Sequence, residues 1–94
     1  MYVRIVRGQP QPEQAEELAR RWKEYAAPRL NSAPGFRHGY LSVERTTNRV
    51  AGVTVWDNKP GEAVDQTMRE FGQQVQDIIA VPPVIEDYEV LAEA

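Results

Sequence analysis

The chain has 94 residues, a formal net charge of −3, no cysteine and a single histidine, His38. This length indicates one domain over residues 1–94, and the missing cysteines exclude disulfides, thiol catalysis and thiolate metal sites. The acidic net charge argues against a nucleic-acid or membrane-surface partner. Because the sequence shows no membrane span and no export leader, we expect a cytoplasmic protein. A single histidine also makes a histidine-built metal centre improbable, so no bound metal is expected.

The N-terminal part of the chain predicts a strand followed by a helix. Apolar and basic residues alternate along Tyr2–Arg7, as is typical of a strand. Pro12 suits the first turn of a helix, and an apolar stripe at helical spacing follows it. Because Pro28 disfavours a helical residue before it, the helix is expected to end near Ala27. The stripe comprises Ala15, Leu18, Ala19, Trp22, Tyr25 and Ala26.

A hairpin of two strands is predicted next. Residues 37–46 form its first strand, and Thr47-Asn48 suits a tight turn because asparagine accepts a left-handed backbone. The stretch Arg49–Pro60 reads as a strand that runs into a helix start, and it is rich in β-branched residues. One face of this strand carries Ala51, Val53 and Val55, and the other carries Val50, Thr54 and Trp56. Apolar residues on both faces predict a strand in the middle of a sheet with both sides covered.

The C-terminal part predicts a second helix and a fourth strand. The helix begins at Pro60-Gly61-Glu62, with Asp57 or Asn58 as its cap. Pro82-Pro83 ends the run, and Val84–Leu91 follows as a strand. The apolar side of the helix comprises Val64, Met68, Phe71, Val75, Ile78 and Ile79.

The element order βαββαβ predicts an α+β, ferredoxin-like fold. Right-handed crossovers place both helices on one face of a four-stranded antiparallel sheet. The opposite face is then bare and apolar, and apolar patches of that size are usually interfaces. We therefore expect a homodimer in which two sheets pack face to face into an α/β barrel.

Two motifs resemble the antibiotic biosynthesis monooxygenase family of dimeric α/β-barrel proteins. They are Ala33-Pro34-Gly35-Phe36 before the second strand, and Val53-Thr54-Val55-Trp56 followed by Asp57–Ala63. The resemblance spans nearly the whole chain. It implies a cofactor-independent oxygenase acting on a small aromatic or polyketide-like compound in a cavity between sheet and helices. The same fold also hosts haem-degrading enzymes, isomerases, decarboxylases and proteins without known activity, so it does not define the function.

Three aromatic residues are candidates for substrate binding. The resemblance aligns Trp56 with a tryptophan that lines the cavity, where it would shape a pocket for a flat aromatic compound. Tyr40 and Tyr88 are candidate hydrogen-bond donors in the same pocket. The alternative is that Trp56 fills the core and that the two tyrosines are packing residues with one exposed end.

His38 is the candidate catalytic base, because histidine alone titrates near neutral pH without a special environment. As a general base it would take a proton from a phenol-like substrate and generate a carbanion that reacts with oxygen. The alternative is an exposed histidine at the start of a strand.

Arg4 is unusual in a strand that should be central, so it needs a carboxylate partner. Glu44, Glu86 and Glu89 are the expected partners. Arg4 either binds an anionic or enolate oxygen of the substrate or belongs to a structural or interface ion pair.

No cofactor is expected. Haem-degrading members of the superfamily carry an asparagine on the first strand and an iron-ligating histidine on the second helix. This chain has no asparagine before Asn31 and no histidine in Asp57–Val81. It also lacks a glycine-rich phosphate loop and any ordered metal-ligand spacing.

Two other functions remain to be compared with oxygenation. A non-enzymatic dimeric binding or interaction domain would use the same barrel as a scaffold, and it predicts a filled interior without a cavity of about 300 Å³. RNA binding shares the βαββαβ order, but the third strand offers only Trp56 and the basic-aromatic signature is missing.

Overall fold

Four strands form one antiparallel sheet in the order β2-β3-β1-β4, in a computed structural model that describes residues 1–94. The strands are β1 (Tyr2–Pro10), β2 (Phe36–Glu44), β3 (Arg49–Trp56) and β4 (Ile79–Glu89). The two central strands, β1 and β3, are those predicted to be central from their β-branched residues and two apolar faces. The predicted ferredoxin-like α+β fold is confirmed.

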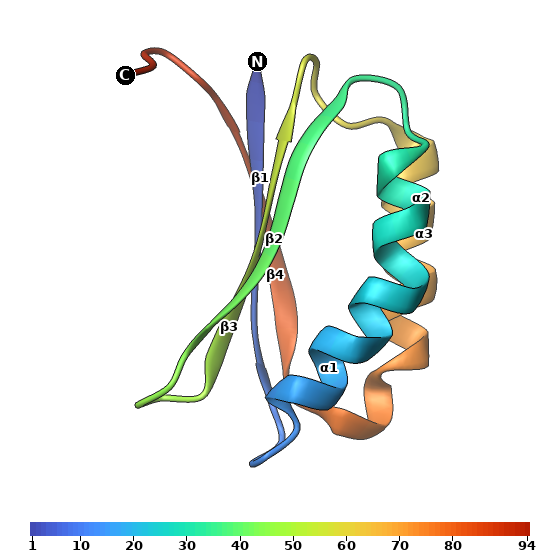
Figure 1. Cartoon of the computed structure of the whole chain (residues 1–94), viewed down its shortest axis with the longest axis vertical. Helices are drawn as coiled ribbons and strands as arrows, with labels where there is room; N and C mark the ends of the chain where they lie inside the picture. The colour runs from blue at the N-terminus through green and yellow to red at the C-terminus, as the bar shows by residue number, and fades with distance from the viewer.

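Two helical segments cover the same face of the sheet, and the other face carries no helix (Figure 1). The first segment consists of α1 (Ala15–Arg21), the π-helical turn η1 (Trp22–Ala26) and α2 (Ala27–Asn31). The second consists of α3 (Glu62–Gln74) and the 3₁₀ turn η2 (Gln76–Ile78). None of these helices combines the length and the apolar character needed to cross a bilayer.

The first helical segment is displaced from its predicted bounds at both ends. Glu13 has a left-handed φ of 67°, so regular helix begins only at Ala15. At the other end the helix continues past Pro28, which lies in the first turn of α2. The preceding turn is widened, and the Ala27 N–H donates to the Trp22 carbonyl five residues earlier. This π-turn accommodates a proline that would otherwise interrupt the helix.

The fourth strand begins earlier than predicted and contains Pro82-Pro83. The prolines are tolerated because β4 is an edge strand, and its pairing with β1 is irregular between Arg7 and Gln9. The predicted cap of the second helix is also wrong: Gly61 occupies the cap position, and no side chain caps the helix.

The alternation predicted for β3 is confirmed and defines the two faces of the sheet. Trp56 and Val50 are buried beneath the helices together with apolar residues of both helical segments. The opposite side, called the open face below, carries half-buried or exposed side chains. Its main members are Val3, Ile5, Tyr40, Ala51, Val53, Val55, Val84 and Tyr88.

Candidate functional site

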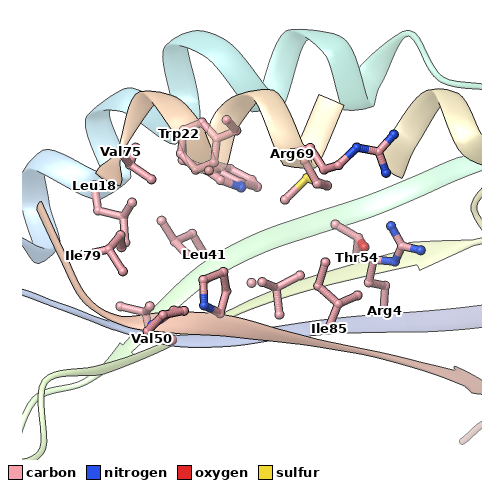
Figure 2. Close-up of a pocket in the computed structure, with 18 of the residues that line it drawn as sticks. Arg4, Leu18, Trp22, Leu41, Val50, Thr54, Arg69, Val75, Ile79 and Ile85 are labelled. Carbon is pink, nitrogen blue, oxygen red and sulfur yellow. The ribbon is translucent and has the colours of Figure 1, made fainter. Parts of the chain in front are cut away.

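A cavity of about 520 Å³ lies between the sheet and the helices (Figure 2). Most of the residues that line it are hydrophobic, and Leu18, Val75 and Ile79 gather at one end. Its volume falls in the range of about 300–1,000 Å³ that is typical of small-molecule sites. The filled interior predicted for a non-enzymatic dimeric binding or interaction domain is therefore wrong, and that alternative can stand only as a protein that binds a ligand in this cavity.

Arg4 occupies the other end of the cavity and is only 5% exposed. Its Nε and Nη2 atoms donate to the two carboxylate oxygens of Asp87 at 2.7 and 3.0 Å. The two residues face each other across the β1–β4 ladder, which gives the bidentate geometry favoured by arginine and carboxylate. The predicted glutamate partners are wrong for Arg4, because the register places Asp87 opposite it and pairs Glu86 with Ile5 instead.

The ion pair alters the titration of both groups. Hydrogen bonding to Arg4 holds the pKa of the Asp87 carboxyl below its usual range, even though partial burial acts in the opposite direction. The same hydrogen bonds raise the pKa of Arg4, so its guanidinium stays charged. The polar end of the cavity therefore carries a permanent cation with its negative partner beside it.

A second carboxylate, Asp65 on α3, lies near the remaining nitrogen of Arg4. Nη1 is 2.8 Å from Asp65 Oδ1, which is close enough for an ion pair. Nη1 is itself fully buried, so the carboxylate of Asp65 is the partner that compensates its burial, and this contact also helps to raise the pKa of Arg4. All three nitrogens of the guanidinium therefore have a carboxylate partner.

Trp56 is 1% exposed and belongs both to the core and to the lining of the cavity. Its indole Nε1 donates to Thr54 Oγ1 at 2.8 Å. The ring of Phe36 packs edge-on against it, with centroids 5.2 Å apart. The pocket and core interpretations of Trp56 are thus compatible, because one face of a core residue borders the cavity.

Thr54 is a cavity residue that the sequence analysis considered only as part of a strand. It is 9% exposed and lies directly opposite Arg4 in the β1–β3 ladder. The sequence could have indicated Thr54 as a cavity residue, because it lies two positions before Trp56 and therefore on the same face of the strand. Arg69 on α3 also reaches the polar end, where its Nη2 is bound to Glu62 and Gln66.

The other candidate residues do not line this cavity. A bulge between Phe36 and His38 sets the alternation of β2 so that His38 and Tyr40 project from the open face, opposite Val55 and Val53. Tyr40 is 62% exposed, so its expected place in the cavity wall is wrong.

Tyr88 is likewise on the open face, opposite Val3. Its hydroxyl donates to Glu86 Oε2 at 2.8 Å. Of the five candidates, Arg4 and Trp56 are brought together around the cavity by β1 and β3.

The fold and the cavity define a ferredoxin-like α+β protein with a ligand-sized chamber between one sheet and its helices. A sequence model of the antibiotic biosynthesis monooxygenase family matches residues 1–69. The chain belongs to this family, as the two sequence motifs predicted.

Several solved structures share the fold over almost the whole chain. Rv0793 from Mycobacterium tuberculosis is 17% identical with a TM-score of 0.75, and the match covers 99% of this chain and 97% of that one. A protein from Bordetella bronchiseptica that carries the family's name is 19% identical, with a TM-score of 0.77 and 97% of each chain covered.

NE2512 from Nitrosomonas europaea, described as a protein of unknown function, is 20% identical with a TM-score of 0.73, covering 99% of this chain and 91% of that one. No curated protein matches the sequence. At these identities the structural likeness establishes the fold alone.

Proposed function

We propose that this protein binds a small, flat aromatic or polyketide-like compound in the cavity and oxygenates it without a cofactor. The observation that carries the proposal is the cavity itself, which is apolar over most of its lining and has hydrogen-bonding groups at one end. Membership of the monooxygenase family supplies the class of reaction.

The proposed reaction starts from a CH₂ or phenolic group activated by a neighbouring carbonyl in a conjugated ring system. For a CH₂ group, loss of one proton gives a carbanion, which transfers an electron to O₂ and combines with it to form a hydroperoxide. Loss of water from the hydroperoxide leaves a ketone, so that CH₂ and O₂ become C=O and H₂O. An apolar cavity protects the carbanion from water.

The cavity offers no strong base for the first step. His38 lies on the open face, and Arg4 lowers the pKa of Asp87, which makes that carboxylate a poor proton acceptor. We therefore expect substrates that are acidic by themselves, such as anthrone-type ketones and hydroquinones. The missing base also favours a second candidate function, a non-enzymatic dimer that binds the same class of compound.

Oxygen uptake distinguishes the two functions. The purified protein is incubated with a panel of anthrone-type ketones and hydroquinones in an oxygen electrode, and products are identified by mass spectrometry. Oxygenation predicts uptake above the spontaneous rate and a product that has gained one oxygen and lost two hydrogens. Binding of the panel without such uptake supports the binding protein.

We also propose that the open face is a homodimer interface. Its central side chains are apolar, and at its edges Tyr40 and Val84 are 62% and 60% exposed. A contiguous apolar surface over the two central strands is costly to leave in water, and an identical sheet matches it in size and chemistry. A cytoplasmic location stays a prediction from the sequence.

A further inference from the structure

The lining of the cavity reaches solvent on one side only. Every lining residue that comes from β1, β2, β3 or the first helical segment is buried or half-buried. The exposed lining residues come from α3, η2 and the edge strand β4, and include Arg69, Gln73 and Gln76 on the helical side and Val81, Pro83 and Ile85 on β4. The cavity therefore opens between α3 and β4, and this opening is called the mouth below.

The two sides of the mouth differ in chemistry. Arg69 and Ile85 lie on opposite sides of the cavity (Figure 2). On the β4 side, Val81 and Ile85 are each 49% exposed although they line the cavity, and the rigid Pro82-Pro83 lies between them. The helical side carries the guanidinium of Arg69 and the amides of Gln73 and Gln76. A flat ring system that passes the mouth can cover the apolar side while its polar substituents stay at the helical side.

Gly72 is the position of α3 that faces the mouth without a side chain. Helical spacing places it on one stripe with Asp65, Arg69 and Gln76, because these residues follow each other at intervals of three and four. Asp65 contacts Arg4, and the other members of the stripe line the cavity, so the stripe faces the side on which the cavity opens. A Cβ added at Gly72 would meet nothing beyond its own stretch of helix within 4 Å.

The backbone of α3 does not require glycine at this position. Gly35 has a left-handed φ of 80°, whereas Gly72 lies in the regular helix Glu62–Gln74. Glycine is less favourable inside a helix than any residue except proline. Neither conformation nor packing accounts for this glycine, and its place at the mouth does.

We infer that a ligand enters the cavity through the mouth between α3 and β4, and that Gly72 determines the size of the ligand that can pass. The inference takes the class of ligand, a flat and mostly apolar compound of fused rings, from the proposed function. It requires binding only and no turnover. A bulky group attached at position 72 would project into the mouth, whereas the same group on an exposed part of α3 outside the lining would not.

A removable side chain at position 72 tests the inference. The chain has no cysteine, so Gly72→Cys introduces a single thiol. Its thiolate reacts with benzyl or methyl methanethiosulfonate, which forms a disulfide to a bulky or a small group and releases methanesulfinate, and dithiothreitol removes either group. Gln74→Cys is the matched control, because Gln74 is exposed on the same helix and does not line the cavity.

Ligand entry is followed by stopped-flow quenching of tryptophan fluorescence with acetonaphthone, since both tryptophans, Trp22 and Trp56, line the cavity. We expect the benzyl group on Gly72→Cys to slow association by about tenfold or more, and the methyl group by less than about threefold. Dithiothreitol should restore the original rate in the same sample. Gln74→Cys should associate as the wild type does with either group attached. Calorimetry with naphthol provides an independent measure of affinity.

The fold of each variant is checked by circular dichroism, and Gly72→Phe, which carries a permanent bulky group, decides the result if Gly72→Cys is poorly folded. A folded variant whose bulky group at position 72 leaves association unchanged would overturn the inference. Equal slowing by the benzyl group on Gln74→Cys, or no binding of either ligand to the wild-type protein, would also overturn it.

The outcome for the mouth is separate from the outcome for the reaction. If the benzyl group blocks binding as expected but no oxygen is consumed by the wild-type protein, the oxygenase proposal fails while the mouth stands. If oxygen uptake is observed and the benzyl group on Gly72→Cys does not slow it or the binding of acetonaphthone, the proposed function stands and the mouth is refuted.

Discussion

The indole Nε1 of Trp56 donates a 2.8 Å hydrogen bond to Oγ1 of Thr54, two residues earlier on the same face of β3. This bond joins a residue of the hydrophobic core to the polar end of the cavity, because both side chains border it. The stability of the core and the orientation of a hydroxyl at the cavity wall thus depend on one contact.

Thr54→Val is expected to lower the free energy of unfolding by about 1–3 kcal/mol, because it leaves the buried Trp56 N–H without an acceptor. Thr54→Ser keeps the acceptor and should lose less. Urea denaturation followed by tryptophan fluorescence measures both variants. A Thr54→Val variant as stable as the wild type would mean that the hydrogen bond from Trp56 makes no measurable contribution to stability.

Arg4→Met is expected to destabilise the protein by about 3–5 kcal/mol, because it leaves the partly buried Asp87 carboxylate without its partner. The double variant Arg4→Met, Asp87→Leu should be more stable than Arg4→Met alone, since the more buried carboxylate is then removed and only the half-exposed Asp65 loses its partner. A double-mutant cycle in urea measures the coupling. A double variant whose loss equals the sum of the single losses would show that the two residues act independently.

The Arg4–Asp87 pair also predicts a loss of stability in acid. The folded-state pKa of Asp87 lies below its unfolded value of about 4, so the stabilisation is complete above that value and is lost as the pH falls through the folded-state pKa. Urea midpoints measured between about pH 7 and about pH 2 should therefore decline on the acid side, and Asp87→Asn should reduce the decline.

Glu17 provides the control for this acid effect. Arg20 and Arg21 lower its pKa to about 2, but the carboxylate lies at the surface in a half-exposed side chain, where solvent screens the interaction. Glu17→Gln is expected to change the pH dependence of stability less than Asp87→Asn does. If Glu17→Gln had the larger effect, exposed helix pairs would govern acid stability in place of the Arg4–Asp87 pair.

Val53→Asp on the open face is expected to convert a homodimer into a monomer, because it places a charge in the centre of the proposed interface. Sedimentation velocity at micromolar concentration measures the change. Leu91→Asp is the control, since Leu91 is 90% exposed near the C-terminus and should leave the dimer intact. A wild-type protein that sediments as a monomer would refute the interface.

His38→Ala is expected to leave ligand binding in the cavity unchanged, because His38 is exposed on the side of the sheet opposite the helices. Calorimetry with naphthol measures the affinity. A loss of more than about threefold in affinity would indicate that the open face and the cavity are coupled, for example through the dimer.

Much of the fold could be predicted from short-range patterns. The alternation along β3 correctly assigned Val53 to one face and Trp56 to the other, and Asn48 has the left-handed backbone expected at the hairpin turn, with a φ of 61°. The errors occurred where tertiary context outweighs a local rule. Pro28 lies inside a helix because a π-turn precedes it, and Pro82 lies inside a strand at the edge of the sheet.

The candidate site could be predicted only in part, because a side chain's face depends on register. The central position of Arg4 indicated correctly that it needs a carboxylate, but the identity of Asp87 follows from the β1–β4 pairing. Tyr40 and His38 were assigned to a cavity wall and a catalytic role from residue type alone, and the bulge in β2 directs both to the open face.

The amino-acid sequence by itself determined the order of elements, the central strands and the family, because periodicity and motifs are properties of neighbouring residues. Only the tertiary structure decided that a cavity remains between the layers and that Arg4, Thr54, Trp56 and Asp87 meet at one end of it. Strand register brings Arg4 together with Thr54 and Asp87, residues fifty or more positions away along the chain, and no local pattern encodes that pairing.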